Sequence, residues 1–176
     1  SYPTSYIQTS GAQATRVADS STSAQATRVA DDAKVDGVNF SNFYNQTQGT
    51  LVARGYTANS TAVGNSGTSR TLLQLSGGTD GVRVGMNNLC GYAVVSAGVE
   101  VAGSSSLGTW SSAQHALGVR IKKDDFAATR DGGTVSTDTS AATPRALKLQ
   151  LGSNAAVDGW LNGHVSRISY YPQPFT

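Results

Sequence analysis

The feature that most constrains this chain is a strict alternation of apolar and polar residues in short runs. The apolar positions of the clearest runs are Val82, Val84, Met86; Leu117, Val119, Ile121; and Leu147, Leu149, Leu151. Successive side chains of a β-strand point to opposite faces, so each run predicts a strand with one buried face. No window of about 12 residues carries the apolar period of an α-helix. Further strands are predicted at 49–56, 71–75, 91–95, 98–102, 126–130, 134–137 and 163–171.

Turn-forming residues separate these runs. They include SGGTDG at 76–81, NN at 87–88, GSSS at 103–106 and DGG at 131–133. Gly, Asn and Asp accept the positive φ that tight hairpin turns require, and Asp131-Gly132 reads as such a turn. About ten short strands joined in this way predict two packed antiparallel sheets. Almost half of the chain is Ser, Thr, Gly or Ala and only 14% is charged, which argues against helical bundles and coiled coils.

Charge and cysteine content exclude several classes of function. The net charge is +2, and no basic cluster exceeds Arg120, Lys122 and Lys123, so we expect no nucleic-acid partner. The single cysteine, Cys90, excludes an intramolecular disulfide and a zinc site built on several thiolates, and we expect it to be buried. No apolar run approaches the ~18 residues of a membrane span, so we expect no membrane insertion.

The N-terminal region contains an internal repeat. The segment AQATRVAD at residues 12–19 recurs identically at 24–31, an offset of 12 residues. The period is too short and the copies too few for a solenoid. We therefore predict an extended N-terminal arm at residues 1–32 and a β-sandwich domain at residues 33–176. An alternative is that the arm packs on a neighbouring subunit, with Arg16 and Arg28 making equivalent contacts.

Four ordered blocks resemble a known family. LNGHVSRISYYP at 161–172 resembles a motif "LNGHIxRIxYYP", NFSNFYNQTQGT at 39–50 is similar to "NFSxWYNQxEGT", and DFAATRDGG at 125–133 is similar to "NDFAASLNGG". PTSYIQTS at 3–10 with TRVAD at 15–19 looks like "PTSYIPT…TRAAD". These motifs are typical of concanavalin A-like (laminin G-like) domains in tail-fibre and other virion proteins of tailed bacteriophages. The resemblance implies a jelly-roll β-sandwich, although Gln8, Phe43 and Gln48 depart from the motifs and the duplicated segment is additional.

Catalysis is not expected. Glycosidases generally need two carboxylates flanking the scissile bond, and glucanases of this fold use a Glu-x-Asp-x-x-Glu strand, whereas Glu100 is the only glutamate here. The two histidines, His115 and His164, lie outside any Gly-x-Ser-x-Gly context. His115 shares a face with Leu117, which predicts a partly buried structural imidazole.

Glycan binding needs aromatic rings and hydrogen-bonding side chains in loops or at strand ends. The candidates are Tyr56, Asn87, Asn88, Tyr92, Trp110, Asp158, Trp160 and His164. Several have alternatives: Trp160 as a cap on the core, and the His164 imidazole as a partner of backbone groups in a turn at Asn162-Gly163. Phe40, Phe43 and Phe126 are predicted core aromatics. We predict no cofactor and no metal site; calcium at the sequence cluster Asp124, Asp125, Asp131 and Asp138 is a minor alternative without an EF-hand pattern.

The resemblance implies a non-enzymatic structural module on the surface of an extracellular phage particle. The predicted function is that of a tail-fibre or adhesin domain, homo-oligomeric on the particle, that recognises host surface polysaccharide. The alternative is a capsid decoration or fibre-assembly subunit that contacts other virion proteins through its arm.

Overall fold

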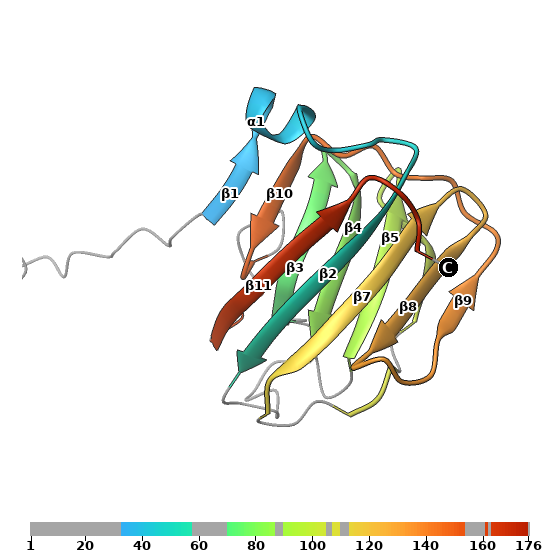
Figure 1. Cartoon of the computed structure of the whole chain (residues 1–176). Coiled ribbons are helices and arrows are strands. Elements are labelled where there is room, and N and C mark those ends of the chain that lie inside the picture. Colours follow the sequence, from blue (N-terminus) through green and yellow to red (C-terminus); the bar gives the residue numbers. More distant parts are fainter. Residues whose placement is uncertain are drawn as a thin grey trace, which may run out of the picture. The chain divides into compact units, whose positions relative to one another are not determined.

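The computed structural model describes residues 33–57, 70–86, 90–104, 107–109, 113–153, 161 and 163–175. The described residues form two antiparallel sheets packed face to face (Figure 1), which is the predicted all-β jelly-roll sandwich. The arm at 1–32, its duplicated segment, Arg16 and Arg28 lie outside the described residues. The predicted role of the arm therefore stays a prediction.

Each sheet is assembled from strands that are distant in sequence. The six-stranded sheet has the order β1 (Ala33–Asp36), β10 (Lys148–Leu151), β3 (Arg70–Gly77), β4 (Asp80–Met86), β5 (Cys90–Ser96) and β6 (Val99–Ser104). The five-stranded sheet has the order β11 (Gly163–Tyr171), β2 (Gln48–Thr57), β7 (His115–Lys122), β8 (Phe126–Arg130) and β9 (Ser136–Asp138). A single turn of helix, α1 (Gly37–Ser41), follows β1.

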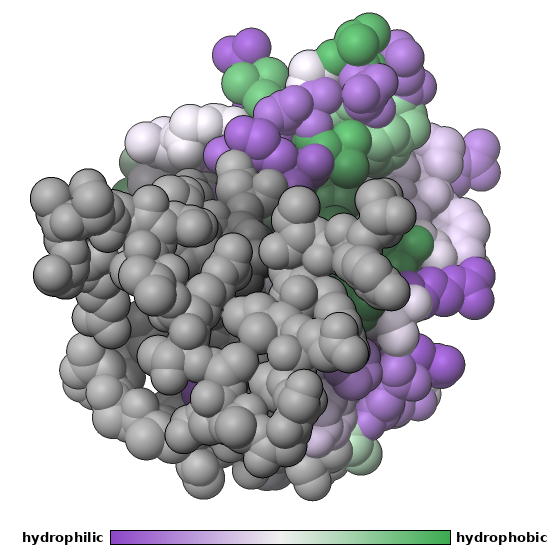
Figure 2. Space-filling model, turned by 90° about the vertical axis from the view of Figure 1, so that its left-hand side faces the viewer, coloured by the Kyte–Doolittle hydropathy of each residue, from purple (hydrophilic) through white to green (hydrophobic). Residues whose placement is uncertain are grey.

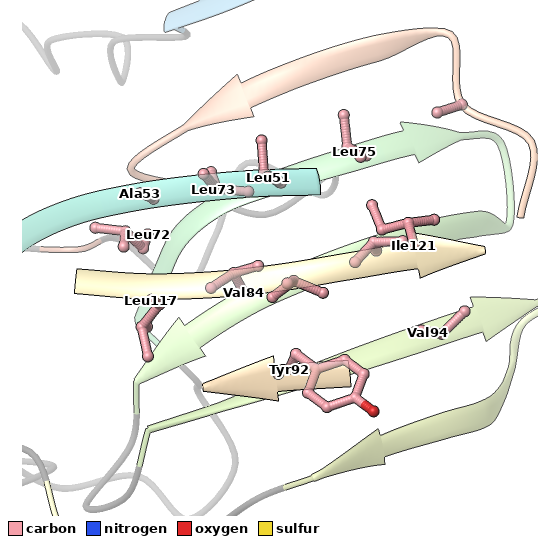
Figure 3. Close-up of a cluster of buried hydrophobic side chains, with 14 of the residues drawn as sticks. Leu51, Ala53, Leu72, Leu73, Leu75, Val84, Tyr92, Val94, Leu117 and Ile121 are labelled. Carbon is pink, nitrogen blue, oxygen red and sulfur yellow. The ribbon is translucent and has the colours of Figure 1, made fainter. Parts of the chain in front are cut away.

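The core fills the space between the two sheets, as the alternation predicts. Leu117, Val119 and Ile121 on β7 and Val82 and Val84 on β4 are all buried. Figure 3 shows side chains from both sheets meeting in this layer. Polar or small residues occupy the intervening positions of β7, which face outward. Burying one such aliphatic side chain contributes about 1.5–3 kcal/mol, so the two inner faces hold the sheets together.

Two predicted core residues are exposed instead. Leu147 is 49% exposed, because β10 begins only at Lys148 and Leu147 itself precedes the strand. Its N–H donates to the Ser76 carbonyl at 2.8 Å. Phe43 is 39% exposed and packs edge-on against Phe40 from outside the core. Phe40 itself is buried, as predicted.

The Asp131-Gly132 turn has the predicted geometry and an additional interaction. Both residues have positive φ, 53° and 70°, and the Gly133 N–H donates to the Arg130 carbonyl at 2.8 Å. The Asp131 carboxylate lies 2.6 Å from Nδ1 of His115 and accepts a hydrogen bond from the Ala116 N–H at 2.8 Å. Burial alone would raise the pKa of Asp131, but the Ala116 hydrogen bond and the His115 and Arg130 side chains outweigh it and lower that pKa.

We therefore predict that Asp131→Asn lowers the free energy of unfolding by about 1 kcal/mol at pH 7. This value is at the low end for a hydrogen bond to a charged group, because the Asp131 carboxylate is 43% exposed. A lowered folded-state pKa stabilises the fold above the unfolded-state pKa of about 3.9 and stops doing so as pH falls through the folded value. The difference from wild type should thus shrink below about pH 4 in urea unfolding. Asp124→Asn, at an exposed position that also has a positive φ of 54°, is the matched control. An equal difference at pH 7 and pH 3 would contradict the charge-based explanation.

Candidate functional site

One end of the sandwich carries two of the predicted binding residues, Tyr56 and His164. At this end β2, β4, β6, β8 and β10 finish and β3, β5, β7 and β11 begin; it is the lower end in Figure 1. We call it the β2–β3 end. Five candidates from the sequence belong to segments between these strands and lie outside the described residues: Asn87, Asn88, Trp110, Asp158 and Trp160. Their roles stay predictions.

Tyr56 and His164, two of the three candidates that the structure describes, are brought together at the β2–β3 end. They are register partners on β2 and β11 and lie on the outer face of the five-stranded sheet. Their ring centroids are 5.1 Å apart with the planes tilted by 32°. His164 is exposed and Tyr56 is half-buried. The imidazole thus contacts an aromatic ring. The alternative from the sequence, a bond to backbone groups at Asn162-Gly163, involves residue 162, which lies outside the described residues, and stays a prediction.

Two arginines lie next to this ring pair. Arg54 and Arg167 are direct register partners on the same two strands, and both are exposed. Because side chains alternate along β2, Arg54 shares the outer face with Tyr56. Arg167 Nε donates to the Ser169 hydroxyl at 3.2 Å. Within the described part of the chain, neither guanidinium forms an ion pair with a carboxylate.

A β-bulge places a further polar pair beside the arginines. The register shifts between Val165 and Arg167, so Ser166 is the extra residue on β11. Its hydroxyl donates to the Arg54 carbonyl at 3.2 Å and accepts from Gln114 Nε2 at 2.6 Å. The outer strip is therefore an exposed, mostly polar surface made of six residues: Arg54, Tyr56, Gln114, His164, Ser166 and Arg167.

Sequence reasoning found two residues of the outer strip and missed four. The outward direction of Arg54 could have been found, because it lies two positions before Tyr56 in a predicted strand. The partnership of Arg54 with Arg167 could not, because it depends on which strands pair and on the bulge at Ser166.

The prediction that Tyr92 contacts a glycan is wrong. It is 3% exposed and faces the core opposite Val84, with Val94 on the same side of β5 (Figure 3). Burial raises the pKa of its hydroxyl, with a smaller contribution from Asp138. A ring in this position has no face available to stack on a sugar.

His115, Cys90 and Glu100 are not part of the outer strip. The His115 side chain is 12% exposed and is held by Asp131, which confirms the predicted structural imidazole. Cys90 is buried, as predicted, and burial raises the pKa of its thiol. Glu100, the single glutamate, lies on β6 of the other sheet, where its carboxylate covers Gly103.

A second surface feature is an apolar groove at the opposite end, beside α1. It encloses about 540 Å³ and is lined by Asn42, Phe43, Leu149, Ile168, Tyr170 and Pro172. The groove opens along the edge where β10 of one sheet faces β11 of the other. Figure 2 looks at this edge and shows hydrophobic residues, in green, between hydrophilic ones. Its lining offers few hydrogen-bonding groups for a sugar.

No three His, Cys, Asp or Glu side chains among the described residues converge as metal ligands would. The helix in this part of the chain is too short to cross a membrane.

Comparison with known proteins shows the fold. No protein-family model matches the chain, and no curated protein matches its sequence. Among solved structures, it is similar to the CBM40 domain of the Ruminococcus gnavus IT-sialidase, with a TM-score of 0.64 and 13% identity over 85% of this chain and 91% of that one. The same domain has been solved bound to α2,3 and α2,6 sialyllactose.

Two further structures share the architecture. Domains LG4-5 of the mouse laminin α1 chain match with a TM-score of 0.56 and 12% identity over 82% of this chain and 40% of that one. Xenopus laevis galectin-Ib matches with a TM-score of 0.51 and 8% identity over 80% of this chain and all of the galectin. The described sandwich is therefore of the concanavalin A, laminin G and galectin kind. At these identities the likeness establishes the fold alone.

Proposed function

We propose that this domain binds glycans without catalysis and that the outer strip is the binding surface. The observation that carries the proposal is the Tyr56–His164 ring pair, an exposed imidazole against a half-buried phenol ring, with amide, hydroxyl and guanidinium groups beside it. Rings of this kind pack against the apolar faces of sugars, while the neighbouring polar groups bind hydroxyls. The binding of sialyllactose by a domain of the same fold supports the proposal.

We also propose that the domain is part of a tailed-bacteriophage particle, as a tail-fibre or adhesin module that contacts host surface polysaccharide. The four ordered sequence blocks support this assignment. The strip is shallow and lies on a strand face, which favours weak single-site binding. Several copies on one particle would turn such contacts into strong attachment through avidity.

Assembly is a second candidate function. The apolar groove beside α1 and two exposed apolar residues at its side, Val38 and Phe43, favour contact with another protein. A capsid decoration or fibre-assembly subunit would use such a surface and the arm. Deleting residues 12–23 distinguishes the two functions: loss of oligomerisation with intact glycan binding would show that the arm acts in assembly.

Glycan binding is tested with the 176-residue chain displayed in several copies on beads and applied to an array of bacterial surface polysaccharides. We predict that wild type binds and that Tyr56→Ala reduces binding at least tenfold, taking the loss of a sugar face packed on the ring to be similar to the loss of a stacked base, about 1–3 kcal/mol. Tyr171→Ala is the matched control, because Tyr171 is on the same strand as His164 but about 20 Å from the ring pair. A folded wild-type chain that binds no polysaccharide would contradict the proposed function.

A further inference from the structure

The arrangement of Arg54 and Arg167 is unfavourable for folding alone. Like charges placed directly opposite each other on neighbouring strands destabilise a sheet. Their Cα atoms are register partners, so the two side chains leave the sheet about 5 Å apart and on the same face. No carboxylate among the described residues neutralises either of them. An anionic group bound between the two guanidinium groups would relieve this repulsion.

The rest of the outer strip indicates which kind of molecule carries the anionic group. The ring pair of Tyr56 and His164 occupies the next register position on the same face. The Ser166 hydroxyl and the Gln114 amide lie beside it. A ligand that contacted both the arginine pair and the ring pair would carry a negative group a few ångströms from a ring-sized apolar face with hydroxyls around it. A carboxylate-bearing sugar has this combination, and a guanidinium fork matches a carboxylate through two parallel hydrogen bonds.

We infer that the outer strip is selective for acidic glycans, with the sugar carboxylate held by Arg54 and Arg167 and the sugar ring packed on Tyr56 and His164. The inference rests on the proposed glycan-binding function and narrows it to a class of ligand. The bulge at Ser166 contributes by setting the register that brings Arg167 opposite Arg54. Because the arginines are exposed, the attraction is screened by salt, and binding weakens as ionic strength rises.

The test compares polygalacturonic acid with its methyl ester, which has the same sugar backbone but neutral ester groups in place of the carboxylates. Hyaluronan, alginate and colominic acid extend the acidic set, and dextran is the neutral control. Binding of the bead-displayed full chain is measured for wild type, Arg54→Gln, Arg167→Gln and the double variant. Lys123→Gln removes the same charge from an exposed turn at the other end of the sheet and controls for net charge.

We expect wild type to bind at least one acidic polysaccharide and the double glutamine variant to bind it at least tenfold more weakly, while Lys123→Gln binds like wild type. The Arg54→Lys and Arg167→Lys variants should be intermediate, because lysine keeps the charge without the planar fork. The double glutamine variant should also melt at the same temperature as wild type or higher, since repulsion is removed. A purely structural role for the arginines would instead lower the melting temperature.

Failure of this inference is distinguishable from failure of the proposed function. Binding of neutral polysaccharides alone, equal binding of the methyl ester, or unchanged acidic binding by the double variant would overturn the acidic selectivity and leave glycan binding intact. Absence of binding to every polysaccharide, acidic or neutral, would overturn both.

Discussion

Replacing Tyr170 by alanine is expected to lower the free energy of unfolding by about 3 kcal/mol, within the range for truncating a large aromatic residue in a packed site. Tyr170 joins β11 to the segment that follows α1. Its ring centroid lies 5.3 Å from that of Tyr44, with the planes tilted by 37°, and the ring covers Gly49, where an added Cβ would lie 2.7 Å from a ring carbon. Its hydroxyl accepts a hydrogen bond from the Asn45 N–H at 3.0 Å and donates to the Gln48 carbonyl at 3.1 Å.

Tyr170→Phe separates these two contributions. It keeps the ring over Gly49 and removes the hydroxyl, so we expect a smaller loss of about 1–2 kcal/mol, since the Asn45 N–H would lose its acceptor. Urea unfolding followed by circular dichroism measures both variants. A loss below 1 kcal/mol for the alanine variant, or equal losses for the two variants, would contradict the assigned role of the ring.

This arrangement gives a physical reason for the two tyrosines in the RISYYP motif. Ile168 and Tyr170 pair with Ala53 and Leu51 and face the core side. Tyr171 faces the other way and contacts Phe175, with ring centroids 4.5 Å apart. Tyr170 therefore supports the fold from the core-facing side of the sheet, and Tyr171 holds the C-terminal residues against the outer face.

The sequence predicted local structure better than it predicted which residues meet. Strands 126–130 and 163–171 have the predicted bounds, because alternation and turn chemistry are local properties. The four residues of β1 and the single turn of α1 were not predicted, since they are too short to display a period. Tyr92 could have been placed correctly, because it has the same strand parity as Val94.

The outer strip depends on long-range pairing. Ser166 and Arg54 are 112 positions apart in the sequence and are joined by a hydrogen bond only because β11 pairs with β2. The single-residue bulge on β11 then decides which side chains lie opposite each other, and neither fact is encoded in local periodicity. Sequence reasoning could therefore identify Tyr56 and His164 separately, but not the arginine pair beside them.

Gly55 and Leu72 connect the outer strip to the core, and we expect the losses of stability from substituting the two residues to be coupled. Gly55 is buried on β2 between Arg54 and Tyr56, and an added Cβ would overlap the Leu72 side chain of the opposite sheet. Gly55→Ala should cost about 1–3 kcal/mol through overpacking, and Leu72→Ala about 3–5 kcal/mol through a cavity. In the double variant the new methyl group occupies part of that cavity. The combined loss should therefore be at least 1 kcal/mol smaller than the sum of the two single losses in urea unfolding.

The same variants test whether the core positions the ring pair. A Cβ at residue 55 would also lie 3.1 Å from the carbonyl oxygen of His164, so Gly55→Ala strains the β2–β11 pairing where Tyr56 meets His164. Leu72→Ala leaves a cavity on the inner side and does not push the strand outward. Glycan binding by folded protein should therefore fall for Gly55→Ala, stay near wild type for Leu72→Ala, and recover in part for the double variant. Additive losses of stability, together with equal binding by all three variants, would show that the core and the outer strip are independent.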